Sequence, residues 1–532
     1  MSLNQIFERR ALRIPSYQRG YAWEKQHRDD LLQDLEDLAQ QRDGRHYTGT
    51  IVVREKGSVL VESDRVSLLD VVDGQQRLTT LVILLSCISD QLREIALQAN
   101  DDAARKRIDD EAWRLKEHFV SDRGLLKLEL SGDGDAFFRN HIIGSEPVPS
   151  PSSRAARNLL DAKKQLRDYV CRRGDYAIRD RSDGDEYADL LALVTRVKEG
   201  LLFVYFEVDS DADVGMMFEA MNSRGKALTQ FEKVKNYLLY VAGKVTEGPA
   251  LESVVRSINE SWIEVFRRLE QAGERASEDA FLRYDWVSYP AAVPSKDGIA
   301  KTYDIHAALK STIRARETSP QERLALVTDY LSRLGPGVRA YASLISPNDK
   351  DAFNDLGRER ESVVDTAARF SRLDRMASTM PLLMAVIVRF AASAPGAVLN
   401  MIRLSEVFAF RMMLLERRSN AGLTSAYGLA REVGAGKGPD ETIRRMEALI
   451  REYAPDSEVT ASFNASDGSL ADGNFYEWSG LRYFLFEYER HRVEERGQKL
   501  AIDWNKLCGK ALEDSIEHIL PQGENTREVE YW

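Results

Sequence analysis

Apolar and polar positions alternate in two distinct ways along residues 1–95. Leucines recur at helical spacing at positions 31, 32, 35 and 38, directly after Asp29 and Asp30, which suit the first turn of a helix. Two β-rich runs follow, at residues 50–53 and 66–72, and each ends in polar or glycine signals. From Gln75 apolar residues recur on one helical face. This region is therefore predicted to be a mixed α/β domain.

The pattern becomes mostly helical and highly charged over residues 96–200, with a Pro/Ser-rich break at 147–153. The apolar run 201–206 predicts a buried strand, and residues 214–221 predict a short helix. Thr229 and Glu232 have the spacing of a capping box, in which each side chain bonds the other residue's backbone N–H. A long helix is predicted to begin there.

Helical periodicity dominates residues 249–452 and is clearest over 398–416, whereas 454–474 is rich in small and polar residues and predicts a linker. An aromatic segment, 475–488, and a charged helix precede a short tail. The fold class is thus predicted as α+β, with a mixed N-terminal domain over residues 1–240 and a helical middle domain over 241–453. Residues 475–532 would form a third part.

Composition narrows the class of protein without identifying it. With 43% apolar and 30% charged residues, the 532-residue chain has the make-up of an ordinary globular protein. It shows neither a signal peptide nor an apolar run long enough for a bilayer, which predicts a cytoplasmic location. Cys87, Cys171 and Cys508 are far apart and predict reduced thiols. The net charge of −11 argues against strong unassisted DNA binding but leaves room for a local basic groove.

The first motif, Asp73-Gly74-Gln75-Gln76-Arg77, lies where a predicted strand meets a predicted helix. Glycine permits a tight turn there, and the N–H groups that open a helix attract anions. Arg77 adds a donor fork for phosphate, Asp73 could hold a metal or orient water, and Gln75 or Gln76 could position a nucleophile. Thr79 and Thr80 add hydroxyls. The alternative is a capped helix whose polar first turn faces solvent.

The second motif interleaves aromatic and polar side chains in the segment Pro15-Ser16-Tyr17-Gln18-Arg19-Gly20-Tyr21-Ala22-Trp23. Aromatic rings can stack on a base while Gln and Arg contact phosphate, so Tyr17, Gln18, Arg19 and Tyr21 are candidates for DNA binding. Trp23 is assigned to packing. The alternative is an aromatic anchor that packs the N-terminus onto the domain.

A third motif, residues 218–229, joins the two helices predicted on either side of it. Asn222 and Gly225 suit a turn, and Arg224 and Lys226 create a local positive charge. Lys233 and Lys235 follow on the next helix. The alternative is an ordinary helix–turn–helix connection.

These three motifs resemble the N-terminal domain of GmrSD-type restriction proteins. The resemblance rests on Asp-Gly-Gln-Gln-Arg followed by Leu-Thr-Thr-Leu, on Pro-x-Tyr-Gln-Arg-x-Tyr-x-Trp, and on Phe-Glu-x-x-Asn-x-Arg-Gly-x-x-Leu-Thr with Lys-Asn-Tyr-Leu. It implies a ParB/sulfiredoxin-like fold and binding and hydrolysis of a nucleoside triphosphate, GTP or ATP, with Mg²⁺. Asp73, Gln75, Gln76 and Arg77 would then be catalytic residues, and Asp73 the metal ligand.

The same resemblance implies binding roles for further residues. Gly74, Thr79, Thr80, Asn222 and Arg224 would contact the nucleotide, with Glu219 a further candidate for the same cleft. His46 and Gly49 match a weaker family feature ahead of the strand at Ile51. The partner would be modified double-stranded DNA, and a homodimer is compatible with the pattern.

Near the C-terminus, residues 515–522 resemble the opening of an HNH-type nuclease domain, in which His518 would activate water. The remaining nuclease residues should lie further on, but the chain stops at Trp532. An incomplete nuclease site is therefore expected. An N-terminal domain ahead of a nuclease domain is similar to the SspE type, which implies sensing of phosphorothioate groups and antiphage defence.

Two other functions remain open from the sequence. A ParB-like fold also serves non-catalytic nucleotide- or DNA-binding switches. Sulfiredoxin-like or phosphotransferase chemistry is less favoured, because no cysteine lies beside the Gly-Gln-Gln-Arg turn and Cys87 is about three helical turns away. No Gly-x-x-x-x-Gly-Lys-[Ser/Thr] loop is present to neutralise a triphosphate.

Overall fold

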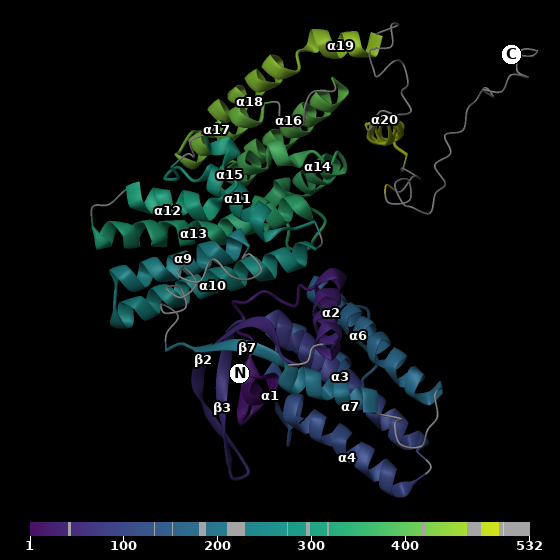
Figure 1. Cartoon of the computed structure of the whole chain (residues 1–532). Helices are drawn as coiled ribbons and strands as arrows, with labels where there is room; N and C mark the ends of the chain where they lie inside the picture. The colour runs from purple at the N-terminus through teal and green to yellow at the C-terminus, as the bar shows by residue number, and fades with distance from the viewer. Residues whose placement is uncertain are drawn as a thin grey trace, which may run out of the picture. The chain divides into compact units, whose positions relative to one another are not determined.

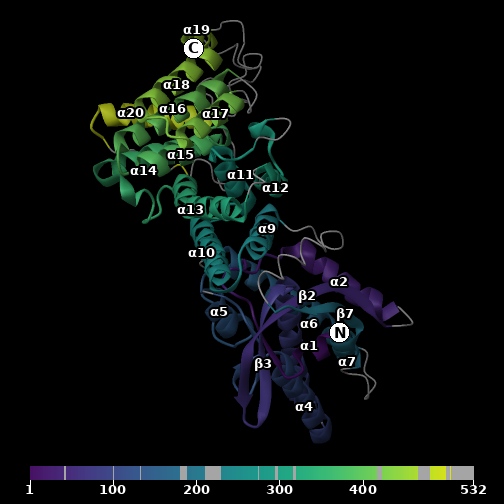
Figure 2. The ribbon, with the colours of Figure 1, turned by 90° about the vertical axis from the view of Figure 1, so that its left-hand side faces the viewer.

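The computed structural model describes residues 1–532 except 41–43, 100, 132, 152, 180–187, 210–228, 274, 294–297, 316–318, 416–421, 465–479, 499–503 and 505–532. The chain divides into two compact units, Met1–Ala352 and Phe353–Trp532. The first unit holds a mixed sheet with its covering helices and a set of further helices, and the second is helical (Figures 1 and 2). The predicted α+β class is confirmed, whereas the functional boundary at residue 240 stays a prediction.

A five-stranded mixed sheet forms the centre of the N-terminal part, in the order β6-β1-β3-β2-β7. Strands β1 and β3 run parallel, β2 lies antiparallel to β3, and β7 pairs parallel with β2. The strands of this sheet are β1 (Arg10–Arg13), β2 (His46–Val61), β3 (Asp64–Asp73), β6 (Leu128–Glu129) and β7 (Leu201–Glu207). A separate two-stranded ribbon joins β4 (Ser121–Asp122) to β5 (Leu125–Leu126).

Helix α3 (Gln75–Gln98) is buried on most of its surface and packs on one face of the sheet (Figure 1). Leu69 and Val71 of β3 join its core cluster, while α4 and α6 pack against α3. A helix that is apolar nearly all round needs such cover. The other helical elements of this part are α1 (Leu3–Phe7), α2 (Lys25–Gln40), α4 (Asp102–Phe119), α5 (Asp133–Phe137), η1 (Phe138–Ile142), α6 (Arg154–Arg179), α7 (Ala188–Thr195) and η2 (Arg196–Gly200).

A helical region completes the first unit, and its helices α9 and α10 pack against each other (Figure 1). Thr229 caps α9 with the reciprocal capping box that the sequence predicts. The helices are α9 (Gln230–Val245), α10 (Gly248–Ala272), α11 (Glu278–Ser288), η3 (Ile299–Lys301), α12 (Ile305–Ala315) and α13 (Pro320–Ile345).

The second unit consists of helices in its described residues (Figure 2). They are η4 (Asn354–Glu359), α14 (Arg360–Arg372), η5 (Met376–Ser378), α15 (Met380–Phe390), α16 (Pro395–Leu414), α17 (Leu423–Gly434), α18 (Pro439–Tyr453), α19 (Asp456–Asn464) and α20 (Leu481–Glu495). Among the described helices of the chain, none is both long and apolar enough to cross a bilayer.

Three local predictions need correction. The linker expected over residues 454–474 contains helix α19, because Ala and Ser tolerate a helix as well as a loop. Strand β7 lies at the sheet edge, so Val204 and Phe206 are exposed to 40% and 37% and the strand is not fully buried. Helix α2 begins at Lys25, one turn before Asp29 and Asp30.

Candidate functional site

The strand–helix junction at Gly74 forms as the sequence predicts. Strand β3 ends at Asp73, Gly74 has a φ of 91°, and α3 begins at Gln75. A Cβ on Gly74 would lie 2.9 Å from Ile51 Cγ1 and 3.1 Å from the carbonyl oxygen of Thr50. Both the backbone conformation and the close approach of β2 therefore require glycine at this position.

Asp73 lies at this junction in an environment that disfavours its charge. Its pKa is raised to about 6, mainly because burial disfavours the charged form and in smaller part because of the negative charge of Glu232. A hydrogen bond from the Gly74 N–H and the charges of Arg77 and Arg19 act in the opposite direction. A carboxylate with this pKa can accept a proton near neutral pH.

Two glutamines connect the Tyr17 motif to the junction. The Gln18 side chain donates to the carbonyl of Val72 over 2.9 Å, and the Gln75 amide donates to Gln18 Oε1 over 3.4 Å. Gln75 Oε1 is buried and has no hydrogen-bond partner in the described part of the chain. Because an unbonded buried acceptor is costly, this oxygen is a place for a ligand donor, a water or a cation.

Helix α9 contributes a carboxylate and a cation. Arg19 Nε lies 3.4 Å from Glu232 Oε1, and Lys235 Nζ lies 3.5 Å from the centroid of the Tyr17 ring. Lys235 also donates to the Tyr17 carbonyl over 3.5 Å and is only 6% exposed. The motif around Tyr17 is thus held between the junction and α9.

These groups surround a small hollow of 40 Å³. Its volume has room for a few water molecules and not for a nucleoside. The polar residues that line it are Gln18, Arg19, Asp73, Gln75, Glu232, Lys235 and Asn236, and Trp262 and Phe266 of α10 complete the wall. The Arg19–Glu232 ion pair lies among these residues, so a phosphate group that reaches Asp73 has to compete with Glu232 for Arg19.

Four residues expected at the site make bonds within the domain. Gln76 accepts from the Ala22 N–H over 2.8 Å and donates to the Gly20 carbonyl over 3.2 Å. The hydroxyls of Thr79 and Thr80 each donate to the carbonyl four residues earlier, and Tyr21 shares a 2.9 Å bond with Thr80. All four residues are buried, so their polar atoms hold the Tyr17 motif and α3 in place. Trp23, assigned to packing, is in the core.

Arg77 lies on another side of the junction and does not line the 40 Å³ hollow. A Cβ on Gly49 would lie 2.9 Å from Arg77 Cζ, so the guanidinium packs on the backbone of β2. Nearby, His46 Nε2 is 3.4 Å from Asp34 Oδ2. Burial raises the pKa of Asp34, and the charges of His46 and Arg77 oppose that rise. The weaker motif of His46 and Gly49 thus surrounds Arg77.

Several predicted residues lie outside the described residues: Glu219, Asn222, Arg224, Cys508 and His518. Within the described part, no group of three or more His, Cys, Asp or Glu side chains is placed to hold a metal ion. Asp73 and the free oxygen of Gln75 could therefore hold Mg²⁺ only together with phosphate and water oxygens, which is how Mg²⁺ is usually bound in nucleotide sites. Burial raises the pKa of the Cys87 thiol to about 12, which leaves it unreactive.

The family comparison accounts for the three motifs together. Residues 3–239 match the family described as GmrSD restriction endonuclease, N-terminal domain. Residues 3–239 are a GmrSD-type N-terminal domain. The matched span includes all three motifs and ends within α9, ahead of the two aromatic residues of α10 that line the hollow. No curated protein matches the chain.

Glu232 and Lys235 line the hollow of this GmrSD-type domain but were not predicted as site residues from the sequence. The signal was present, because Glu232 belongs to the capping box and Lys235 to the third block of the resemblance. Their approach to residues more than 200 positions earlier depends on how α9 packs. The positions of Trp262 and Phe266 in the wall of the hollow could not be predicted from the sequence, since apolar residues on a helix usually indicate only a core face.

Proposed function

We propose that the GmrSD-type domain hydrolyses a nucleoside triphosphate, GTP or ATP, at Asp73, and that modified DNA controls this turnover. The observation that carries the proposal is the convergence of one proton-accepting carboxylate with two cations, Arg19 and Lys235, on a single hollow. Hydrolysis of a triphosphate needs an oriented water and positive charge beside the terminal phosphate.

Each of these side chains has a distinct role in the proposal. Asp73 accepts the proton of a water whose oxygen attacks the terminal phosphorus, while the bond from that phosphorus to its bridging oxygen breaks. Gln75 Oε1 accepts the second hydrogen of the water. Arg19 and Lys235 stabilise the charge of the phosphate oxygens, with Arg19 offering a donor fork and Lys235 a point charge. Mg²⁺ held by the phosphate oxygens of the nucleotide and by one oxygen of Asp73 would supply further neutralisation of phosphate charge.

The family match supports a proposed biological role. The domain belongs to restriction endonucleases, so we propose that the protein acts in antiphage defence and senses modified DNA, phosphorothioate-bearing DNA being the first candidate. An HNH-type nuclease domain that includes His518 would cut the DNA. A non-catalytic switch is the second candidate, because the hollow is small and closed by the Arg19–Glu232 ion pair, a geometry that also suits binding without turnover.

Phosphate release tests the proposal directly. We expect GTP or ATP turnover that rises when phosphorothioate DNA is added, with little response to unmodified DNA. Lys235→Met keeps the apolar stem against Tyr17 but removes the charge, so turnover should fall at least ~10-fold. Lys233→Met, on the same helix but outside the hollow, is the control. Binding of nucleotide without turnover under every condition would leave the switch as the better account.

Glu232→Gln should strengthen nucleotide binding. Glutamine at this position still completes the capping box of α9, so the helix start is kept. Arg19 would lose its competing carboxylate, an ion pair worth about 1 kcal/mol, so affinity should rise about threefold to tenfold. Titration with a fluorescent GTP analogue measures the change.

Glu247→Gln is the control for this variant, because it removes the same charge from an exposed position at the start of α10. Unchanged or weaker binding by Glu232→Gln, with a normal control, would show that the ion pair does not restrict phosphate access.

A further inference from the structure

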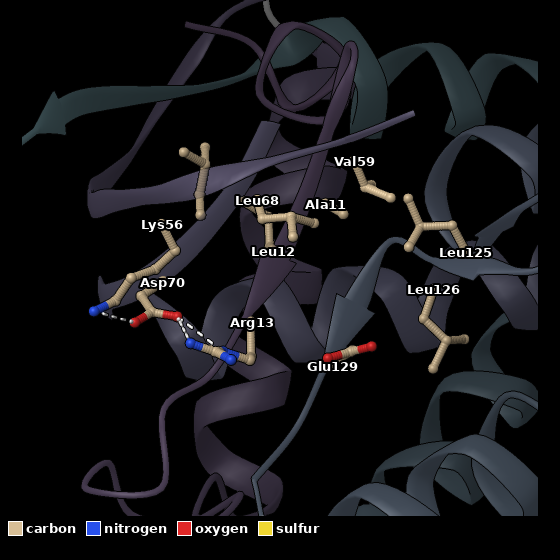
Figure 3. Close-up of a pocket in the computed structure, with 11 residues that line it drawn as sticks. Ala11, Leu12, Arg13, Lys56, Val59, Leu68, Asp70, Leu125, Leu126 and Glu129 are labelled. Atoms are coloured by element: carbon tan, nitrogen blue, oxygen red, sulfur yellow. Dashed lines mark hydrogen bonds and ion pairs between the residues drawn. The ribbon is translucent and has the colours of Figure 1, made fainter. Parts of the chain in front are cut away.

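A second group of charged side chains lies on the sheet face opposite α3. Asp70 Oδ1 accepts from Arg13 Nε and Nη2 over 2.9 and 2.7 Å (Figure 3). Arg54 Nη2 and Lys56 Nζ lie 3.6 and 3.7 Å from Asp70 Oδ2. We call these four residues the Asp70 cluster. Three cations share one carboxylate, so the cluster carries more positive than negative charge.

The strand register explains why the cluster forms. Arg13 of β1 and Arg54 of β2 are both directly opposite Asp70 of β3. Side chains alternate between faces along a strand, and Leu69 and Val71 point into the core with α3. Asp70 and its two arginine neighbours must therefore share the other face. Asp70 itself is almost fully buried, with a side chain only 3% exposed, and it fixes the positions of the cations around it.

The Asp70 cluster lines a large hollow of 620 Å³. Its other wall is α10, which presents Glu252, Arg256 and Glu260. Tyr17 lines both this hollow and the small one at Asp73, so the two hollows are neighbours at this residue. The exposed fractions of the side chains are 54% for Arg13 and 41% for Lys56, so their charged ends reach solvent.

We propose that the Asp70 cluster binds a phosphodiester group of the DNA backbone. The inference rests on the proposed function, because it assigns the DNA contact of the domain that would hydrolyse the nucleotide. The hollow is lined by four basic and three acidic side chains, so it keeps a small positive excess in a chain whose net charge is −11, and its cations on the sheet face are already oriented for a polyanion. Arginine forks suit phosphate oxygens, and the carboxylate keeps them oriented before the ligand arrives.

A nucleotide also carries phosphate groups that cations such as those of the Asp70 cluster bind. Phosphate that belongs to a nucleotide is expected at Arg19 and Lys235 in the small hollow. The larger hollow is open, and exposed cations gain most from a chain of closely spaced phosphates that releases counterions. The location beside Tyr17 would place a DNA strand next to the nucleotide site, which is the arrangement that control of turnover by DNA requires.

Fluorescence anisotropy with a labelled duplex tests the inference. The double variant Arg13→Gln/Lys56→Gln removes the two cations whose charged ends reach solvent, so it should weaken DNA binding at least ~10-fold and reduce the slope of log K against log salt by about 2. Arg105→Gln/Lys106→Gln, on the exposed surface of α4, removes the same charge and should change both quantities little. In the opposite direction, Glu252→Gln/Glu260→Gln should strengthen DNA binding, a gain that a misfolded variant cannot produce.

A parallel titration with a fluorescent GTP analogue separates the two sources of phosphate. Loss of nucleotide affinity with unchanged DNA affinity in Arg13→Gln/Lys56→Gln would overturn the inference. So would equal losses of DNA affinity in this variant and in the α4 control. If the wild-type protein shows no turnover but the DNA effects appear, the inference stands and the proposed hydrolysis fails.

Discussion

Asp73→Asn is expected to abolish nucleotide turnover and at the same time to stabilise the folded protein. Asparagine cannot accept the proton of the attacking water, so turnover should fall by at least ~100-fold. The pKa of Asp73 is raised to about 6, which means that the native state disfavours the charged carboxylate. A neutral isostere removes that penalty, about 3 kcal/mol at neutral pH, since the pKa lies about two units above its ordinary value and each unit corresponds to ~1.4 kcal/mol.

The pH dependence has a defined sign. The native state binds the Asp73 proton more tightly than the unfolded state does, so the group favours the native state in acid. This contribution is lost as pH rises from the unfolded pKa through about 6. The gain in unfolding temperature of Asp73→Asn should therefore be present at pH 7–8 and disappear near pH 4. Wild-type turnover should rise with pH through about 6, as Asp73 becomes the deprotonated base.

Thermal unfolding and phosphate release across this pH range measure both effects. Asp64→Asn is the control, because Asp64 lies at the exposed start of the same strand. Loss of turnover without stabilisation would mean that Asp73 is not strained by burial. Stabilisation with turnover retained would show that Asp73 is not the base.

Gly74→Ala should have the largest effect on stability. Alanine would have to adopt a φ of 91° and would bring a Cβ within 3.1 Å of the Thr50 backbone oxygen and 2.9 Å of Ile51. The combined cost of backbone strain and overpacking is about 2–4 kcal/mol. The unfolding temperature of the sheet-containing unit should fall by roughly 5–10 °C, and turnover should drop because Asp73 and Gln75 flank the displaced residue.

Gly124→Ala separates the two causes, because Gly124 has a φ of 88° but no atom within 4 Å of the added Cβ. This control should show only the backbone cost, about 1 kcal/mol. If both variants lose the same stability, the close approach of β2 to Gly74 contributes nothing, and the account of the junction is wrong.

The local features of this chain could be predicted from sequence because each depends on neighbouring residues. The strand ending at Asp73, the helix beginning at Gln75 and the capping box of Thr229 and Glu232 follow from β-rich runs, glycine and helical spacing. The misassigned linker at 454–474 shows the limit of composition, since residues 456–464 are helical.

Only the tertiary structure showed which polar groups of this motif line the hollow. The sequence presents Gln75, Gln76, Thr79 and Thr80 as equals, but their positions around one helix direct Gln75 to the hollow and the other three to the core. Helical periodicity predicts which residues share a face, but a mostly buried helix has no solvent face to tell ligand contacts from packing.

The sequence by itself did not determine which residues far apart in the chain come into contact. The sequence by itself predicted an α+β protein with a GmrSD-type motif set, a glycine turn after a strand and a net acidic charge. The packing of α9 brings Lys235 onto Tyr17, and strand register places Arg13 and Arg54 opposite Asp70. Such contacts join residues tens to hundreds of positions apart, and they form because the buried faces of the sheet and helices pack in one way, which no local pattern records.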